Sequence, residues 1–194
     1  MVKFFGNLNA VLVAGLVILV AIMFALHGGA MDQGEVYANA VMRYLHVLSG
    51  IMWIGLLYYF NFIQVPAMAG IPAEQKPAIS GHIAPRALFW FRWAAAATVL
   101  TGLIVAWLTN ELVEALTLRP GFMLIGLGMW MALIMAFNVW FIIWPNQKKV
   151  LGIVEADADA KAKAATTAMI ASRTNTLLSI PMLYCMVTQG LLGG

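Results

Sequence analysis

Four residues that could bind a cofactor share one face of an apolar segment. They are Arg43, His46, Gly50 and Trp53, which are spaced by three or four residues. A helix would align them, and an ionisable side chain inside an apolar helix normally faces the interior of a bundle. There His46 could ligate haem iron, Arg43 could pair with a propionate, and Gly50 could make room for a flat ring. The alternative is that His46 hydrogen-bonds a neighbouring helix and that Trp53 fills the core.

A second set of polar side chains could bind an anion, either a substrate or a haem propionate. These residues are Arg86, Arg92, Asn138, Arg173 and Asn175. We expect them to meet in a polar pocket at one end of the bundle. The alternative for Arg92 is that it extends to the lipid headgroups. The alternative for Asn175 is that it bonds the carbonyl freed by Pro181 and caps its helix.

Several other kinds of chemistry are excluded by the residues present. The single cysteine, Cys185, rules out an internal disulfide, a zinc site built on a cysteine pair, and a covalently attached c-type haem. The chain contains no phosphate-binding loop, no H-E-x-x-H motif and no G-x-S-x-G motif. No catalytic residue is therefore assigned.

The composition indicates which elements position these residues. The chain has 194 residues, of which 63% are hydrophobic and 10% are charged. Soluble domains carry about 25% charged residues, so this chain is predicted to be an integral membrane protein in contact with the lipid bilayer. A soluble enzyme fold is excluded. The net charge of +3 comes from bases that sort by membrane side, so nucleic-acid binding is not expected.

The pattern of apolar segments predicts an all-α membrane bundle with five transmembrane helices. They cover residues of about 8–26, 38–65, 87–108, 121–144 and 175–192. Pro66 and Pro145 are expected to end two of them. An alanine-rich cytoplasmic helix is predicted over about 155–173, running into the fifth span. The whole chain, 1–194, is interpreted as a single transmembrane domain.

The charges between the spans predict the orientation. The first connection carries only acids, Asp32 and Glu35, whereas Lys and Arg concentrate in the second and fourth connections. Because cytoplasmic loops carry the excess of Lys and Arg, the N-terminus is predicted to be cytoplasmic and the C-terminus periplasmic. The expected location is the inner membrane of a bacterium.

Three stretches together resemble a known family. They are YLHVLSGIMWIGLLYYFNF at 44–62, NVWFIIWPNQKKV at 138–150 and SRTNTLLSIPMLYCM at 172–186. The first is similar to an L-H-x(6)-W-x-G helix shared by two related bacterial families. One is the membrane domain of the PuuD-type urate hydroxylases, the urate oxidase N-terminal family, and the other is the HemJ-type protoporphyrinogen oxidases. The second and third stretches resemble the PuuD-type family.

The resemblance implies a redox function. PuuD-type proteins oxidise urate and pass the electrons to a fused cytochrome c domain, which this shorter chain lacks, so a separate cytochrome c would be the partner. His46 matches the family histidine and would bind haem b, while Arg173 and Asn175 match the polar entry to the last helix. HemJ-type oxidation of protoporphyrinogen is an alternative.

A role without catalysis is a further alternative. The chain contains small residues that suit contacts between helices, such as Gly15, Gly102 and Gly126. It could therefore be a non-catalytic subunit of a respiratory or photosynthetic membrane complex, or form a homo-oligomer. A transporter is disfavoured because the sequence has no detectable inverted repeat.

Overall fold

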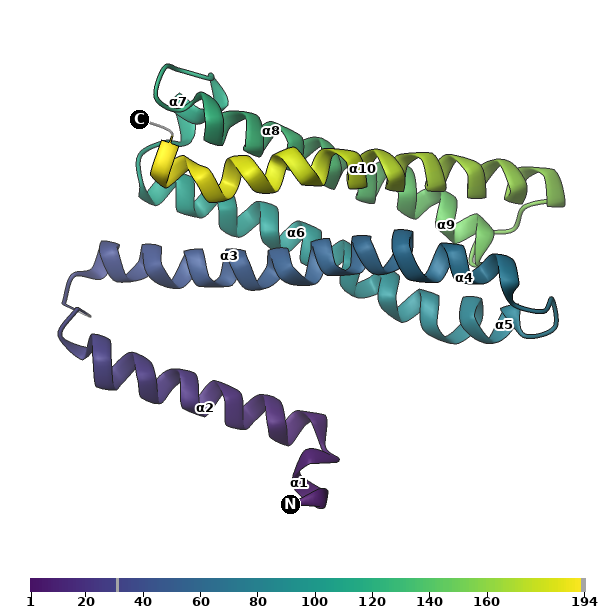
Figure 1. Ribbon diagram of the computed structural model, residues 1–194, viewed down its shortest axis with the longest axis horizontal. Helices are drawn as coiled ribbons and strands as arrows, with labels where there is room; N and C mark the ends of the chain where they lie inside the picture. The colour runs from purple at the N-terminus through teal and green to yellow at the C-terminus, as the bar shows by residue number, and fades with distance from the viewer. Residues whose placement is uncertain (31, 193–194) are drawn as a thin grey trace. The chain divides into compact units, whose positions relative to one another are not determined.

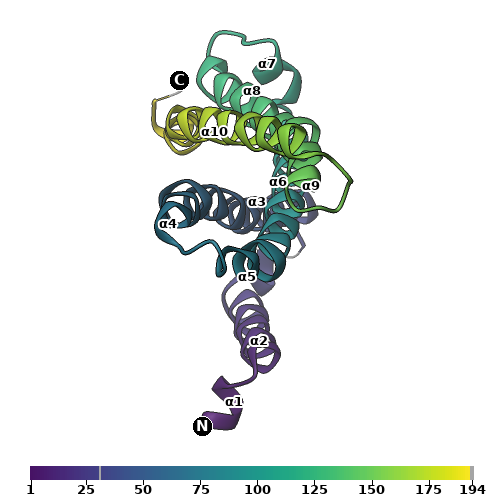
Figure 2. The ribbon, with the colours of Figure 1, turned by 90° about the vertical axis from the view of Figure 1, so that its right-hand side faces the viewer.

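The computed structural model describes residues 1–30 and 32–192, and all of their regular secondary structure is helical (Figures 1 and 2). This confirms the predicted all-α class. The chain divides into two compact units, residues 1–41 and residues 42–194. Each unit is described by itself, and the single-domain organisation stays a prediction.

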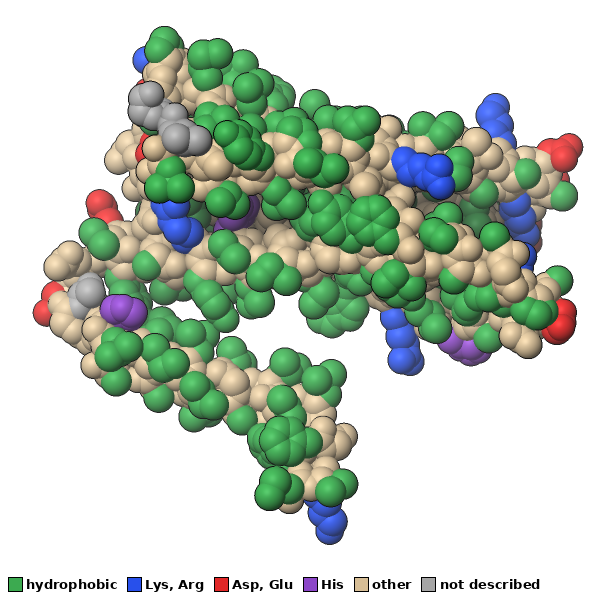
Figure 3. Space-filling view, viewed as in Figure 1, with side chains coloured by type: hydrophobic (Ala, Val, Ile, Leu, Met, Phe, Trp, Pro, Cys, Tyr) green, Lys and Arg blue, Asp and Glu red, His purple; other side chains and the backbone are tan. Residues whose placement is uncertain are grey.

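The first unit consists of short and long helices with little buried surface. It holds α1 (Val2–Phe5), α2 (Leu8–His27), the 3-10 turn η1 (Gly28–Ala30) and the first residues of α3 (Gly34–Tyr58). The side chain of Asn7 caps α2 by accepting hydrogen bonds from the amides of Asn9 and Ala10. No residue of α2 is buried, and apolar side chains cover its visible face (Figure 3). Such a helix fits a lipid environment.

The second unit contains long helices that are interrupted by π-helical turns. After α3 come η2 (Tyr59–Gln64), α4 (Val65–Gly70), α5 (Lys76–Ala78), η3 (Ile79–Ile83) and α6 (Ala84–Leu108). Then follow α7 (Leu112–Leu116), α8 (Met123–Phe137), η4 (Asn138–Ile143), α9 (Trp144–Val150) and α10 (Ala158–Leu192). The helix α10 lies alongside α8 and α9 (Figure 1).

Each π-helical segment is followed, at the second position, by a proline. The three prolines are Pro66, Pro85 and Pro145. A proline in a regular α-helix clashes with the carbonyl four residues earlier and removes a hydrogen bond, and a wider turn relieves that clash. The helices therefore continue to Gly70 and Val150, whereas the sequence predicts ends at Pro66 and Pro145. That part of the prediction was wrong.

Side-chain donors bond carbonyl groups at or beside these π-helical segments. Asn61 Nδ2 donates to the carbonyl of Leu57 at 2.9 Å, and Asn175 Nδ2 donates to the carbonyl of Met135 at 2.9 Å. A π turn disturbs the regular ladder of backbone bonds, and buried carbonyls need a partner. The polar side chains near the π turns therefore complete the backbone hydrogen bonding of the bundle.

The core of the second unit lies where α3, α6, η4 and α10 meet. Its largest fully buried side chains include Trp53, Phe91, Leu57, Met135 and Val139. Close helix contact elsewhere depends on glycine, because a Cβ at Gly128 would lie 3.0 Å from Cβ of Cys185 on α10. The core thus fixes the register of α3 against α6 and of α8 against α10.

Four helical stretches among the described residues are long and apolar enough to cross a membrane. They are Leu8–His27, Gly34–Gly70, Lys76–Leu108 and Met123–Val150. The predicted cytoplasmic helix and fifth span form one continuous helix, α10, with Pro181 inside it. Its C-terminal half carries several polar side chains, among them Gln189, which is bonded to the backbone of Gly121 and Ile125. The number of five spans and the sides of the two termini stay predictions.

Candidate functional site

His46 faces α6 from the predicted position on α3. Its Nδ1 lies 2.9 Å from the carbonyl oxygen of Thr98 and 3.4 Å from Oγ1 of Thr101. Because a carbonyl only accepts, Nδ1 carries the proton and Nε2 keeps its lone pair. The hydrogen bond to a neighbouring helix is therefore present. Histidines that ligate metals hold their second nitrogen in the same way, so the bond is compatible with both interpretations.

Gly102 makes room for the imidazole of His46. A Cβ at Gly102 would lie 2.8 Å from Cε1 of His46, which is closer than side chains approach. By contrast, a Cβ at Gly50 would meet only Cγ2 of Thr98, at an ordinary 3.9 Å. Sequence reasoning singled out Gly50 and missed this role of Gly102, since the two helices are brought together only by the fold.

A small cavity adjoins His46. It is lined by His46, Thr98, Val99, Gly102, Leu103, Met129, Ala132, Leu133 and Met186 and has a volume of about 40 Å³. Cofactor pockets usually enclose about 300–1,000 Å³. The donor chemistry of His46 fits an axial ligand to haem iron, but the cavity does not hold a porphyrin ring without widening.

Arg43 and Trp53, which share the face of α3 that carries His46, differ in their surroundings. Arg43 lies one helical turn before His46 and is exposed. Trp53 is fully buried in the core, and its Nε1 has no hydrogen-bond partner among the described residues. Trp53 therefore fills the core, which is the alternative to a place beside a cofactor.

Asn138 and Asn175 form a buried pair between η4 and α10. Nδ2 of Asn138 donates to Oδ1 of Asn175 at 2.8 Å, and Asn175 in turn donates to the carbonyl of Met135. Both side chains are at least nine-tenths buried. Asn175 thus bonds a carbonyl of another helix rather than the one freed by Pro181. Two further bonds join α10 to the end of α3 and to η2: Tyr58 OH to Ser179 Oγ at 3.0 Å, and Asn61 Nδ2 to Ser172 Oγ at 2.8 Å.

The three arginines of the predicted anion pocket occupy different surroundings. Cζ of Arg92 lies 3.4 Å from the ring centroid of Trp144 and 5.9 Å from that of Trp140. Arg86 and Arg173 are exposed. Within the described part of the chain, no hydrogen bond joins these arginines to the asparagine pair. Their role in binding an anion stays a prediction.

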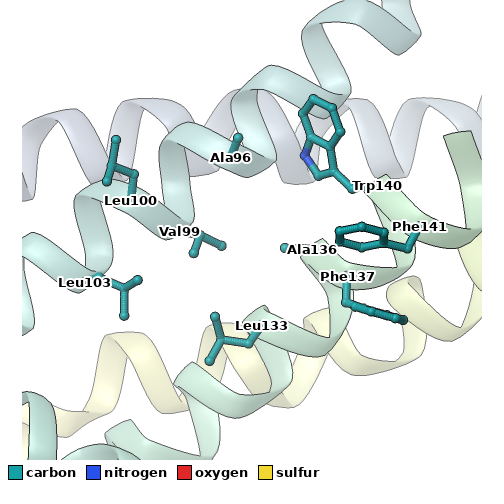
Figure 4. Close-up of a pocket in the computed structure, with 9 residues that line it drawn as sticks. All are labelled: Ala96, Val99, Leu100, Leu103, Leu133, Ala136, Phe137, Trp140 and Phe141. Atoms are coloured by element: carbon teal, nitrogen blue, oxygen red, sulfur yellow. The ribbon is translucent and has the colours of Figure 1, made fainter.

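An apolar groove runs between α6 on one side and α8 and η4 on the other (Figure 4). Its volume is about 420 Å³, and it is lined by Ala96, Val99, Leu100, Leu103, Leu133, Ala136, Phe137, Trp140 and Phe141. Val99, Leu103 and Leu133 line both this groove and the cavity at His46. Sequence reasoning missed the groove because its lining residues are ordinary apolar residues of a membrane helix.

Within the described part of the chain, His46 is not part of a cluster of side chains that could hold a metal ion. Groups of three or more His, Cys, Asp or Glu side chains that could hold a metal ion are absent from the described residues. Cys185 is buried against Gly128, where it packs as a small apolar side chain. Any metal held here would therefore have to bring most of its ligands with it, as the iron of a haem does.

The comparison with known families finds a match in the C-terminal part of the chain. Residues 103–191 match the family described as Urate oxidase N-terminal. This range includes the stretches 138–150 and 172–186, and it confirms the resemblance to that family. The stretch 44–62, which contains His46, lies outside the match. No curated protein and no solved structure matches the chain.

Proposed function

Because residues 103–191 match the urate oxidase N-terminal family, we propose that this chain is a membrane-embedded redox protein that oxidises urate or a similar planar substrate. The family match supports the substrate class, and the long apolar helices support the membrane location. The observation that carries the redox assignment is the inward-facing imidazole of His46. Its Nδ1 is fixed by the Thr98 carbonyl, and its Nε2 is left for a ligand.

The group that His46 would hold is haem b. His46 would provide one axial ligand, Thr98 would fix the orientation of the imidazole, and Gly102 would keep the space beside it open. Arg43, one turn away on α3, would pair with a propionate. Haem b would supply a one-electron carrier inside the membrane. Because the cavity measures about 40 Å³, the helices around His46 would have to separate for a porphyrin ring to be held there.

The substrate would bind through the basic and amide groups of the second unit. Of the residues predicted for this role, Arg86 and Arg173 are exposed cations, Arg92 lies on Trp144, and Asn138 and Asn175 form the buried pair. Hydroxylation of urate with oxygen from water releases two electrons and two protons. A separate cytochrome c would accept the electrons one at a time. Oxidation of protoporphyrinogen, as in the HemJ-type family, is the alternative reaction.

An absorption spectrum tests the haem proposal directly. Protein purified from haem-replete cells should show a Soret band that is lost in His46→Ala. The matched controls are His27→Ala and His82→Ala, because these histidines are exposed and are the only others in the chain. Gly102→Val keeps the ligand but fills the space beside it, and should also lower the haem content. A colourless, folded wild type, or a band that survives in His46→Ala, contradicts the proposal.

Turnover tests the reaction separately from the haem. Membranes containing the wild-type chain should reduce added ferricytochrome c when urate is supplied, and membranes with His46→Ala should not. If the protein carries haem but neither urate nor protoporphyrinogen drives reduction, the redox centre stands and the substrate assignment fails.

A second candidate function is a non-catalytic subunit of a larger membrane complex. The observation that favours it is the close packing at His46, where Gly102 lies against the imidazole and the adjoining cavity measures only about 40 Å³. This function predicts a colourless protein that copurifies with an oxidase or a reaction centre in mild detergent. Purification as a homo-oligomer with turnover would exclude it.

A further inference from the structure

Arg92 is a cation on the long apolar helix α6, and no salt bridge joins it to an acidic side chain among the described residues. Its Nε and Nη1 atoms are buried and have no hydrogen-bond partner among the described residues. The guanidinium lies over the ring of Trp144, which favours the positive charge but accepts no conventional hydrogen bond. An arginine stays protonated in proteins, and a buried charge without a partner is costly. Arg92 as a whole is only partly buried, so an acceptor from outside the protein could approach the accessible edge of the guanidinium and offset part of that cost.

The apolar groove of Figure 4 begins beside this guanidinium. Arg92 lies one helical turn before Ala96, which lines the groove, and its Cζ is 5.9 Å from the ring of Trp140, which also lines it. All nine lining residues are apolar, and the volume is about 420 Å³. A cation at one end of a hydrocarbon-lined groove matches a molecule with an anionic head and an apolar tail.

The surroundings of Arg92 match the headgroup region of a membrane. Lys148 places Nζ 5.9 Å from the ring of Trp144, and the exposed Trp93 makes an edge contact with Trp140. Tryptophans concentrate at the membrane interface, and basic pockets between transmembrane helices bind anionic headgroups. The predicted orientation puts this end of the bundle at the cytoplasmic leaflet, whose lipids carry negative charge.

We propose that an anionic phospholipid binds at this site, with its phosphate on Arg92 and one acyl chain in the groove between α6 and η4. A free phosphate would leave the groove empty. A helix of another protein would fill the groove but would bring no anion to Arg92 unless it carried a carboxylate. The phospholipid offers both an anion to the accessible edge of the guanidinium and an acyl chain to the apolar lining.

Native mass spectrometry of the full chain in mild detergent tests the proposal. Phosphatidylglycerol and phosphatidylcholine with the same acyl chains are titrated, and glycerol 3-phosphate supplies the headgroup chemistry without a tail. The wild type should prefer phosphatidylglycerol about fivefold, which corresponds to the attraction of one basic residue for an anionic lipid surface. Arg92→Gln should remove the preference, and Arg92→Lys should retain part of it. Arg119→Gln removes an exposed cation from the connection between α7 and α8 and should leave the preference unchanged.

A second variant separates the tail from the head. Ala96→Leu fills the groove and should weaken the binding of both lipids without changing their ratio. Equal binding of the two lipids to the wild type overturns the proposal, as does a preference that survives in Arg92→Gln. Binding of glycerol 3-phosphate as tight as that of phosphatidylglycerol would assign the site to soluble phosphates instead. If Ala96→Leu leaves the binding of both lipids unchanged, no acyl chain occupies the groove and the proposal is wrong.

Discussion

Two buried asparagines show how individual polar residues hold this apolar bundle together. Asn175 is fully buried, accepts a hydrogen bond from Asn138 and donates one to the carbonyl of Met135. A polar group in such surroundings is costly unless it is bonded, and the bond from Asn175 to Met135 also satisfies a backbone carbonyl. The pair therefore ties η4 to α10 at the position where the backbone ladder of α8 changes to a π turn.

Removal of the Asn175 amide is expected to destabilise the protein. Asn175→Ala leaves Asn138 and the Met135 carbonyl without their partner, so we expect a loss of about 1–3 kcal/mol in the free energy of unfolding. Chemical unfolding in detergent, followed by circular dichroism, measures this loss. The control is Thr174→Ala, an exposed neighbour whose hydroxyl bonds only its own helix, at Ile170. A double-mutant cycle with Asn138→Ala should give a coupling of about 0.5–2 kcal/mol. Additive effects would mean that the pair contributes nothing.

The environments of single residues in the structure show how far the sequence predicts them. Helical spacing and the cost of a buried ionisable group correctly predict that His46 faces the bundle interior. Spacing along one helix cannot predict that Gly102, 56 positions later in the chain, lies against His46 or that Arg92 lies on Trp144. Those contacts depend on the register between helices, which is set by the packing of the core.

At the scale of the elements, prolines do not end helices here. The sequence predicts the existence of α2, α3, α6, α8 and α10 well, because each is a long apolar or alanine-rich stretch. It does not predict the π-helical turns, since nothing in the local composition of Asn138–Ile143 differs from an ordinary membrane helix. The wider turn, together with side-chain donors such as Asn61, lets the helix pass Pro66. Helix ends placed at a proline are therefore unreliable in this bundle.

The contact between α7 and α8 depends on one glycine. A Cβ at Gly126 would collide with the carbonyl oxygen of Ala115 and would lie 2.7 Å from Cδ2 of Leu118. The turn that carries these atoms has little freedom to move, because Leu118 is already in the left-handed region at a φ of 53°. Gly126 is thus required for the close approach of the two helices.

Gly126→Ala is expected to lower stability by about 1–3 kcal/mol, the usual cost of overpacking, and to separate the 112–116 helix from α8. Thermal unfolding in detergent and proteolysis of the loop around Arg119 measure the two effects. Gly55→Ala is the matched control, because a Cβ there has no neighbour within 4 Å. An Ala variant at Gly126 that is as stable as the control would mean that α7 shifts freely.

At the scale of the whole molecule, the membrane topology depends on whether α10 crosses the bilayer. The helix has 35 residues and is therefore about 52 Å long, which exceeds the roughly 30 Å hydrocarbon thickness of a bilayer. Three of its charged residues, Asp159, Lys161 and Lys163, lie in the first two turns, and Arg173 follows about three turns later. The excess length and the charges fit a helix that begins in the cytoplasm and enters the bilayer near Arg173.

The side of the C-terminus tests this interpretation. With a cytoplasmic N-terminus, five spans place the C-terminus in the periplasm, whereas four spans would leave it in the cytoplasm. An alkaline phosphatase fused after α10 should therefore be active, and a green fluorescent protein fused there should be dark. In a Cys185→Ser background, an impermeant maleimide should label Thr117→Cys on intact cells but label Lys161→Cys only after permeabilisation. A fluorescent C-terminal fusion would show that α10 does not cross. The whole of α10, including the charges of its first two turns, would then lie at the membrane surface. The contacts between α10 and α8 would in that case have to form outside the bilayer core.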